Sequence, residues 1–135
     1  MEYITLANGV KMPLLGYGVY QVDPAECERC VTDAIAVGYR SIDTAQAYGN
    51  EAGDGEGIRR SGIPREEIFV TSKVAAEHKS YATAAQSIHQ TLTTMGLDYV
   101  DLMLIHSPQP WAEVNQSDNR YFPENRQVWR ALEDA

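Results

Sequence analysis

Residues 38–50 read Gly-Tyr-Arg-Ser-Ile-Asp-Thr-Ala-Gln-Ala-Tyr-Gly-Asn. The beginning of this stretch alternates in polarity like a β-strand and stops at Asp43. A loop follows, in which Gly49 turns the chain directly after Tyr48. An acid at the end of a strand and a phenol in the next loop suit a functional site at one end of a sheet. Whether such a site exists depends on partners from the rest of the chain.

Composition places the chain among globular proteins of one domain. Its 135 residues suffice for a single core, and 44% hydrophobic with 22% charged residues is ordinary for that class. The formal net charge is −8, and no basic cluster exceeds the pair Arg59–Arg60, which argues against a nucleic acid or an anionic membrane as partner. No apolar run reaches the length of a membrane span, and the first residues lack a signal-peptide pattern. We therefore expect a cytoplasmic protein.

Strand and helix signals alternate along the chain. Asn8-Gly9 between two short apolar runs predicts a β-hairpin over residues 1–13. Further strands are expected at about 14–20, 39–44, 68–73 and 99–106. Helices are expected at about 24–37, 50–61 and 80–95, with a last one from about residue 124. This order implies about four βα units of a parallel α/β sheet with right-handed crossovers.

Ionisable residues end three of these strands in phase. Asp43, Lys73 and His106 follow one another at intervals of 30 and 33 residues, which is about one βα unit per step. The carboxyl ends of neighbouring parallel strands meet at one rim, where sites of α/β proteins form. We therefore expect these three side chains to lie close together, with Tyr48 reaching them from the loop.

A free phenol has a pKa of about 10, which is too high for a ready proton donor at neutral pH. A lysine beside a tyrosine lowers this pKa, because its ammonium favours the phenolate. Asp43 is expected to keep Lys73 charged and in place, and His106 to donate a hydrogen bond to a polarised oxygen. These groups suit the protonation of a carbonyl oxygen, with a hydride supplied by a bound cofactor. One Asp and one His are too few for a catalytic metal site, which disfavours a metal-dependent hydrolase.

Cys27 and Cys30 form a lone Cys-x-x-Cys pattern. It is read either as a redox pair, as half of a zinc site, or as two small apolar residues on one helix face. No second cysteine pair and no histidine pair of suitable spacing accompanies it. The structural interpretation is therefore favoured.

At this point the chain resembles the aldo-keto reductases, a TIM-barrel family. The resemblance covers essentially all 135 residues and is densest at 38–51, 61–73 and 97–106. It implies a single domain over residues 1–135 that forms the N-terminal half of a (β/α)8 barrel, with residues 1–13 plugging its bottom. It also implies reduction of an aldehyde or a ketone with NADPH, or with NADH as the alternative cofactor.

The resemblance assigns roles to individual residues. Tyr48 matches the family's proton donor, Lys73 and Asp43 its tuning residues, and His106 the residue that orients the substrate carbonyl. The cofactor is expected at Gly18, Val19, Tyr20 and Asp43. The substrate is expected at Tyr20, Tyr48, His106 and Trp111. No metal is implied.

Three departures from the family pattern accompany this resemblance. A TIM barrel needs about 250 residues, and the family builds most of its cofactor pocket from the second half, so the chain alone is expected to be truncated and weak or inactive. In the helix after Asn50, Asp54 replaces an apolar residue, and three glycines, which cost up to ~1 kcal/mol each relative to alanine, predict a weakened helix. Ala75 stands where the family often has a tryptophan, which widens the pocket.

An alternative function is non-catalytic. A half barrel has two open sheet edges, and open edges invite pairing with other chains. The chain would then be a remnant, or an interaction module that associates with itself.

Overall fold

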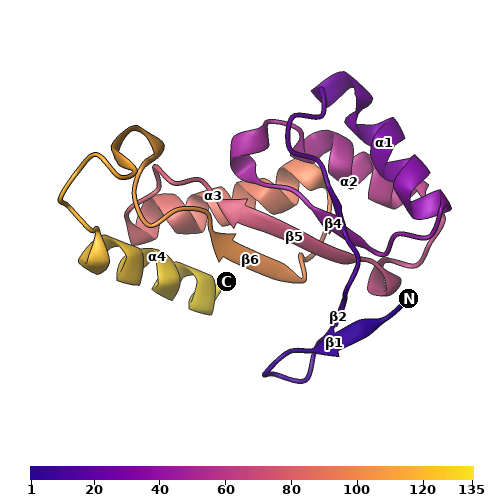
Figure 1. Ribbon diagram of the computed structural model, residues 1–135, viewed down its shortest axis with the longest axis horizontal. Helices are drawn as coiled ribbons and strands as arrows, with labels where there is room; N and C mark the ends of the chain where they lie inside the picture. Colours follow the sequence, from indigo (N-terminus) through magenta and orange to yellow (C-terminus); the bar gives the residue numbers. More distant parts are fainter.

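The computed structural model describes residues 1–135 and is built on a four-stranded parallel sheet (Figure 1). Its strands lie side by side in chain order as β3 (Tyr17–Gly18), β4 (Ser41–Asp43), β5 (Phe69–Val74) and β6 (Leu102–Ile105). The register sets Gly18 beside Asp43, and Asp43 beside Thr71. The expected parallel sheet with about four βα units is confirmed.

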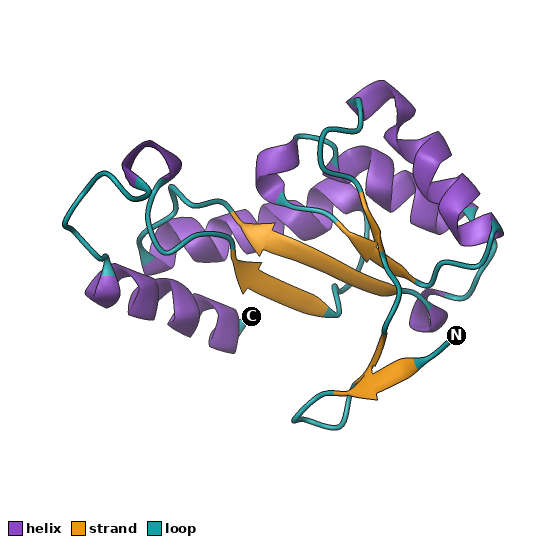
Figure 2. Ribbon diagram, in the orientation of Figure 1, coloured by secondary structure: helices purple, strands orange, loops and turns teal.

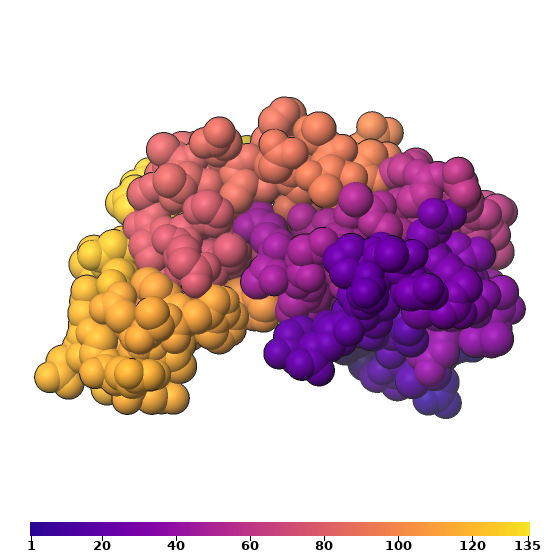
Figure 3. Space-filling view, turned by 90° about the horizontal axis from the view of Figure 1, so that it is seen from above, coloured from indigo at the N-terminus to yellow at the C-terminus, as the bar shows by residue number.

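One α-helix follows each strand of this parallel sheet (Figure 2). The helices are α1 (Pro24–Ala36), α2 (Glu51–Arg60), α3 (Tyr81–Met95) and α4 (Phe122–Asp134). Each helix packs against the next, so that they form a second layer along the sheet. From above, the molecule is curved and hollowed on one side, between the N-terminal segments and those near residue 120 (Figure 3). None of the helices combines the length and the apolar composition that crossing a bilayer would require.

The N-terminal hairpin lies at the amino ends of the strands. Strands β1 (Tyr3–Thr5) and β2 (Lys11–Pro13) pair antiparallel, with Ile4 opposite Met12. Together with Phe69 and Asp101, at the start of β5 and just before β6, residues of this hairpin line a crevice. The expected hairpin is confirmed, and it lies away from the rim at which the strands end.

The strands are shorter than the sequence indicates, and two of the helix ends have well-defined caps. Strand β3 has two residues, and Leu14 and Leu15 before it are each 57% exposed. The side chain of Asp23 accepts a hydrogen bond from the Ala25 N–H and begins α1, as N-cap residues do. Gly96, at a φ of 63°, ends α3.

The core lies between the sheet and its helices in two clusters. The larger one, beneath α1 and α2, contains Val19, Cys27, Val31, Ile35, Ile42, Ile58, Ile68, Val70 and Met95. The smaller one, beneath α3 and α4, contains Val74, Ala84, Ile88, Val128 and Ala131. Cys27 is fully buried in the larger cluster, and burial together with the neighbouring Asp54 raises the pKa of its thiol. A buried, protonated thiol suits the structural interpretation of the Cys-x-x-Cys pattern.

The glycines of α2 let this helix approach its neighbours closely. A Cβ atom on Gly53 would lie 2.7 Å from Cβ of Cys27, and one on Gly57 would lie 2.8 Å from Cβ of Val31. On another face of α2, a Cβ atom on Gly55 would overlap the carbonyl of Met95. These distances are too short for side chains. The low helix propensity of α2 is therefore a requirement of packing, and the expected weak segment forms a regular helix.

Asp54 is the residue of α2 whose burial lowers the stability of the fold. It is fully buried, its Oδ1 accepts a hydrogen bond from Sγ of Cys27 at 3.3 Å, and its Oδ2 has no partner. Burial raises the pKa of the Asp54 carboxyl to about 6, although the nearby Thr44 hydroxyl and the Cys27 thiol act against it. Compared with the unfolded chain, the folded protein therefore favours protonated Asp54, and ionisation of this carboxyl destabilises the fold.

We predict that Asp54→Asn stabilises the fold at neutral pH. The ordinary pKa of 3.8 holds in the unfolded chain, so wild type loses stability as the pH rises from about 4 to about 6. Above that window the variant should be more stable by roughly 3 kcal/mol, and below pH 4 the difference should vanish. Urea unfolding across this pH range measures it.

The exposed Asp118 offers a matched control. Asp118→Asn should leave the free energy of unfolding nearly unchanged at every pH. An Asp54→Asn protein whose advantage over wild type does not depend on pH would contradict the prediction.

Candidate active site

The rim of the sheet gathers the four residues that the sequence predicts. Asp43 is the last residue of β4, Lys73 lies one residue before the end of β5, and His106 directly follows β6. Tyr48 closes the short 3₁₀ helix Gln46–Tyr48, which follows β4. Segments far apart in the sequence thus meet at one place, as expected from the carboxyl ends of parallel strands.

Three oxygen atoms surround the Lys73 ammonium. Nζ donates hydrogen bonds to the Asp43 carboxylate, to the Thr44 carbonyl at 2.8 Å and to Oη of Tyr48 at 3.4 Å. The Lys73 side chain is 12% exposed, whereas that of Asp43 is 46% exposed. The positive charge is therefore fixed beside the phenol, while the carboxylate remains open to solvent.

His106 lies against two aromatic rings. Its imidazole meets the Tyr48 ring edge-on at 5.7 Å between centroids and the Trp111 ring at 5.0 Å. Burial, and then the positive charge of Lys73, lower the pKa of His106, while Asp43 and Glu77 act in the opposite direction. Its Nδ1 is buried without a partner. The ring is therefore neutral at pH 7 and has one N–H to donate.

A hollow of about 480 Å³ opens above these groups. It is lined by Tyr20, Ala47, Tyr48, His106 and Trp111. The Tyr20 ring, 67% exposed, lies 5.2 Å from the Tyr48 ring between centroids, and the Trp111 ring, 46% exposed, lies against His106. All four residues predicted to contact the substrate therefore line one cavity.

The residues predicted to hold a cofactor are placed differently from one another. Gly18 pairs with Asp43 at the edge of the sheet and is exposed, and Tyr20 stands in the hollow. Val19 between them is fully buried in the larger core cluster. Its side chain points away from the hollow, its N–H donates to the carbonyl of Asp43, and its own carbonyl accepts from the N–H of Val22. Val19 therefore leaves no free polar group for a ligand.

The site also depends on buried polar residues that sequence reasoning missed. Asn50 is 1% exposed, and its Nδ2 donates to the carbonyls of Val19 at 2.9 Å and Val22 at 3.1 Å. Thr44 donates from its hydroxyl to Oδ1 of Asn50 at 3.3 Å. Asn50 thereby ties the segment that carries Tyr20 to the loop that carries Tyr48. Its place directly after Gly49 was the only signal, because a buried amide gives no periodic pattern.

Comparison with known proteins gives a consistent result. The model of the aldo/keto reductase family matches residues 7–135. An uncharacterized oxidoreductase of Bacillus subtilis is 46% identical over 134 residues. That match covers 96% of this chain and 44% of the relative.

Solved structures of the same kind superpose on the chain. An aldo/keto reductase from Brucella melitensis gives a TM-score of 0.87 at 38% identity, covering 98% of this chain and 47% of that one. An aldo-keto reductase of Bombyx mori in complex with NADP gives 0.84 at 32% identity, covering 99% and 46%. The chain thus spans less than half the length of these relatives, and its sheet is confirmed as half of a TIM-type barrel.

We predict that His106 titrates below its ordinary pKa of 6.5. The cause is burial together with the charge of Lys73, so Lys73→Met should raise the midpoint without restoring it fully. Histidine Cε1–Hε1 resonances followed by NMR between pH 4 and 8 measure this midpoint, and a His106→Gln variant assigns the signal. A midpoint at or above 6.5 in wild type would show that the imidazole is not desolvated as described.

Proposed function

Because the chain belongs to the aldo-keto reductase family, we propose that its rim residues take part in the NADPH-dependent reduction of an aldehyde or a ketone, with Tyr48 as proton donor. One observation carries this proposal. The Tyr48 hydroxyl lies 3.4 Å from a fixed ammonium and faces a hollow that is open to a small molecule.

Tyr48 donates its proton to the substrate oxygen as negative charge develops there. The ammonium of Lys73 stabilises the phenolate that remains, because opposite charges at short range attract strongly in a partly buried site. Asp43 and the Thr44 carbonyl keep Nζ in place during this step. Tyr48, Lys73 and Asp43 therefore act together in the transfer of this proton.

His106 orients the carbonyl group. As a neutral imidazole, it donates one N–H to the substrate oxygen without adding a second positive charge beside Lys73. Its edge-on contacts with Tyr48 and Trp111 fix the plane of the ring. The substrate oxygen then lies between two donors, Tyr48 and His106.

The Bombyx mori relative, whose structure is a complex with NADP, supports NADP(H) as the cofactor. A nicotinamide cofactor supplies the hydride in this chemistry. The flat ring of Tyr20 and the exposed backbone at Gly18 suit a nicotinamide beside Tyr48. Phosphate groups are usually held by the side chains of lysine and arginine or by the N-termini of helices, and neither a lysine nor an arginine lines the hollow. We therefore expect the 135-residue chain to bind NADPH weakly and to turn over slowly by itself.

Replacing the proton donor tests the proposal. In Tyr48→Phe we expect kcat for the reduction of aldehydes with NADPH to fall about 10²- to 10⁴-fold, the range typical of a lost general acid. The phenylalanine keeps the ring, so circular dichroism should be unchanged. NADPH oxidation followed at 340 nm against a panel of aldehydes and ketones measures the rate.

Tyr3→Phe is the matched control, because Tyr3 lies in the hairpin at the opposite end of the strands. It should retain the wild-type rate. A Tyr48→Phe protein with an unchanged rate would remove Tyr48 from the reaction.

A second candidate function is self-association, and the open sheet favours it. Strands β3 and β6 each pair on one side only. Leu104, which shares a face of β6 with His106, is 38% exposed, and Trp129 of α4 is 55% exposed. Apolar side chains beside a free strand edge suit a second copy of the same chain, whose β3 edge can pair with β6.

Sedimentation velocity over a range of concentrations tests this second function. We expect a mass above the 15.0 kDa of one chain, and Leu104→Lys should shift the distribution toward that monomer mass. Val37→Lys at the end of α1, where the side chain is already 78% exposed, should leave it unchanged. A monomer at every concentration would exclude the self-association proposal and leave the catalytic one untouched.

A further inference from the structure

The loop that carries Tyr48 is fixed from behind by side chains that do not line the hollow. Gln46 is central to this arrangement. Its Oε1 accepts a hydrogen bond from the Ala75 N–H at 2.8 Å, and its Nε2 donates to Oγ1 of Thr91 at 3.1 Å. One amide side chain thus joins the loop after β4 to the end of β5 and to helix α3.

A buried carboxylate completes the network. Glu51 is 8% exposed, and its Oε1 accepts hydrogen bonds from Oγ of Ser72 at 2.6 Å and from Oγ1 of Thr91 at 3.2 Å. Burial raises the pKa of Glu51, and these two hydroxyl donors oppose that shift. Since a buried carboxylate without donors is costly, Glu51 holds Ser72 and Thr91 in fixed positions.

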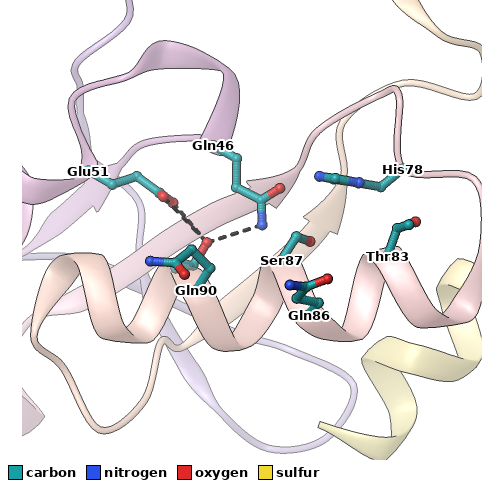
Figure 4. Close-up of a pocket in the computed structure, with 8 residues that line it drawn as sticks. Gln46, Glu51, His78, Thr83, Gln86, Ser87 and Gln90 are labelled. Carbon is teal, nitrogen blue, oxygen red and sulfur yellow. Dashed lines mark hydrogen bonds between the residues drawn. The ribbon is translucent and has the colours of Figure 1, made fainter.

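The network lies on the helix side of the sheet. Figure 4 shows Gln46 and Glu51 extending toward α3, where both bond to Thr91, in a depression of about 450 Å³ with polar walls. Gln86, Ser87 and Gln90 line the same depression from α3. No residue of this depression belongs to the hollow above Tyr48, so its side chains act on the site only through the backbone they hold.

The network brackets the two residues of the proposed acid. Gln46 lies two residues before Tyr48, and Glu51 lies three residues after it. Their partners Ser72 and Ala75 lie one residue before and two residues after Lys73. The relative position of these two segments sets the 3.4 Å between the Tyr48 hydroxyl and the Lys73 ammonium.

We propose that Gln46 and Thr91 are positioning residues that hold Tyr48 against Lys73. This inference rests on the proposed function, because it assigns them to the same proton donor. The distance of 3.4 Å is already at the long end of a hydrogen bond, so a small displacement of the loop breaks the contact. Displacement by about 1 Å of a group that takes part in a reaction can cost about 10²-fold in rate.

The test uses side chains that keep size and lose hydrogen bonds. Gln46→Met and Thr91→Val remove the bonds that join the loop to α3, and Thr91→Ser keeps the hydroxyl. Gln90→Met is the matched control, because Gln90 lines the same depression but bonds only to Thr94 of its own helix. Gln46→Met leaves both donors to Glu51 in place, so it decides the question if Thr91→Val does not fold.

Two measurements apply to the 135-residue chain. The first is the NMR cross-relaxation between the Tyr48 ring protons and the ε-methylene of Lys73, which reports their proximity without any cofactor. It should weaken several-fold in Gln46→Met and Thr91→Val, and persist in Thr91→Ser and Gln90→Met. The second is carbonyl reduction, where kcat should fall about 10- to 100-fold in the first two variants with the KM for NADPH unchanged.

The outcomes separate this inference from the proposed function. Equal cross-relaxation in Gln46→Met and Gln90→Met would overturn the positioning role, whatever the activity. Full turnover by Tyr48→Phe would overturn the proposed function, and the NMR comparison would still decide whether the network holds Tyr48. Loss of turnover in Tyr48→Phe with wild-type kcat in Gln46→Met and Thr91→Val would overturn only the positioning role.

Discussion

The Lys73 ammonium is the interaction on which the candidate site depends. Its three hydrogen-bond acceptors all come from residues 43–48, so one charge joins the end of β4, the following loop and β5. With a side chain only 12% exposed, Lys73 depends on these oxygens for its stability as a cation. The Asn50 amide and the bonds of Gln46 hold the same segments from other directions. The position of the Tyr48 hydroxyl therefore depends on how firmly these bonds hold the loop after β4.

Helix α2 carries two buried acids that differ in how they are satisfied. Glu51 accepts from two hydroxyls, whereas Asp54, one turn later, accepts from a weak thiol donor and leaves one oxygen unpartnered. Burial raises the pKa of both carboxyls. The first acid therefore organises the structure around it, and the second mainly costs stability. The effect of a buried carboxylate on stability therefore depends more on the hydrogen-bond donors around it than on its position in the helix.

The sequence predicts the residues at the carboxyl ends of the strands, but not the hydrogen bonds that hold these residues in place. Asp43, Lys73 and His106 were predictable because each follows an apolar strand at a regular interval. The partners of Gln46 lie 29 and 45 residues away on other elements, and no local pattern reveals such contacts. The burial of Val19 was equally hidden, because β3 is too short for alternation to define its faces. The packing role of the α2 glycines was hidden as well, because propensity describes an isolated helix and not its contacts with neighbouring helices.

The close approach of α1 and α2 has a consequence for how such sequences can change. The missing Cβ atoms of Gly53 and Gly57 are matched by Cys27 and Val31 on the facing helix. A larger residue at either glycine is therefore tolerable only when the opposite position becomes smaller or the helices move apart. Because α2 begins directly after the Tyr48 loop, moving it would carry that loop along. Evolution at these positions is thus constrained to paired exchanges of volume, far from any atom that would touch a substrate.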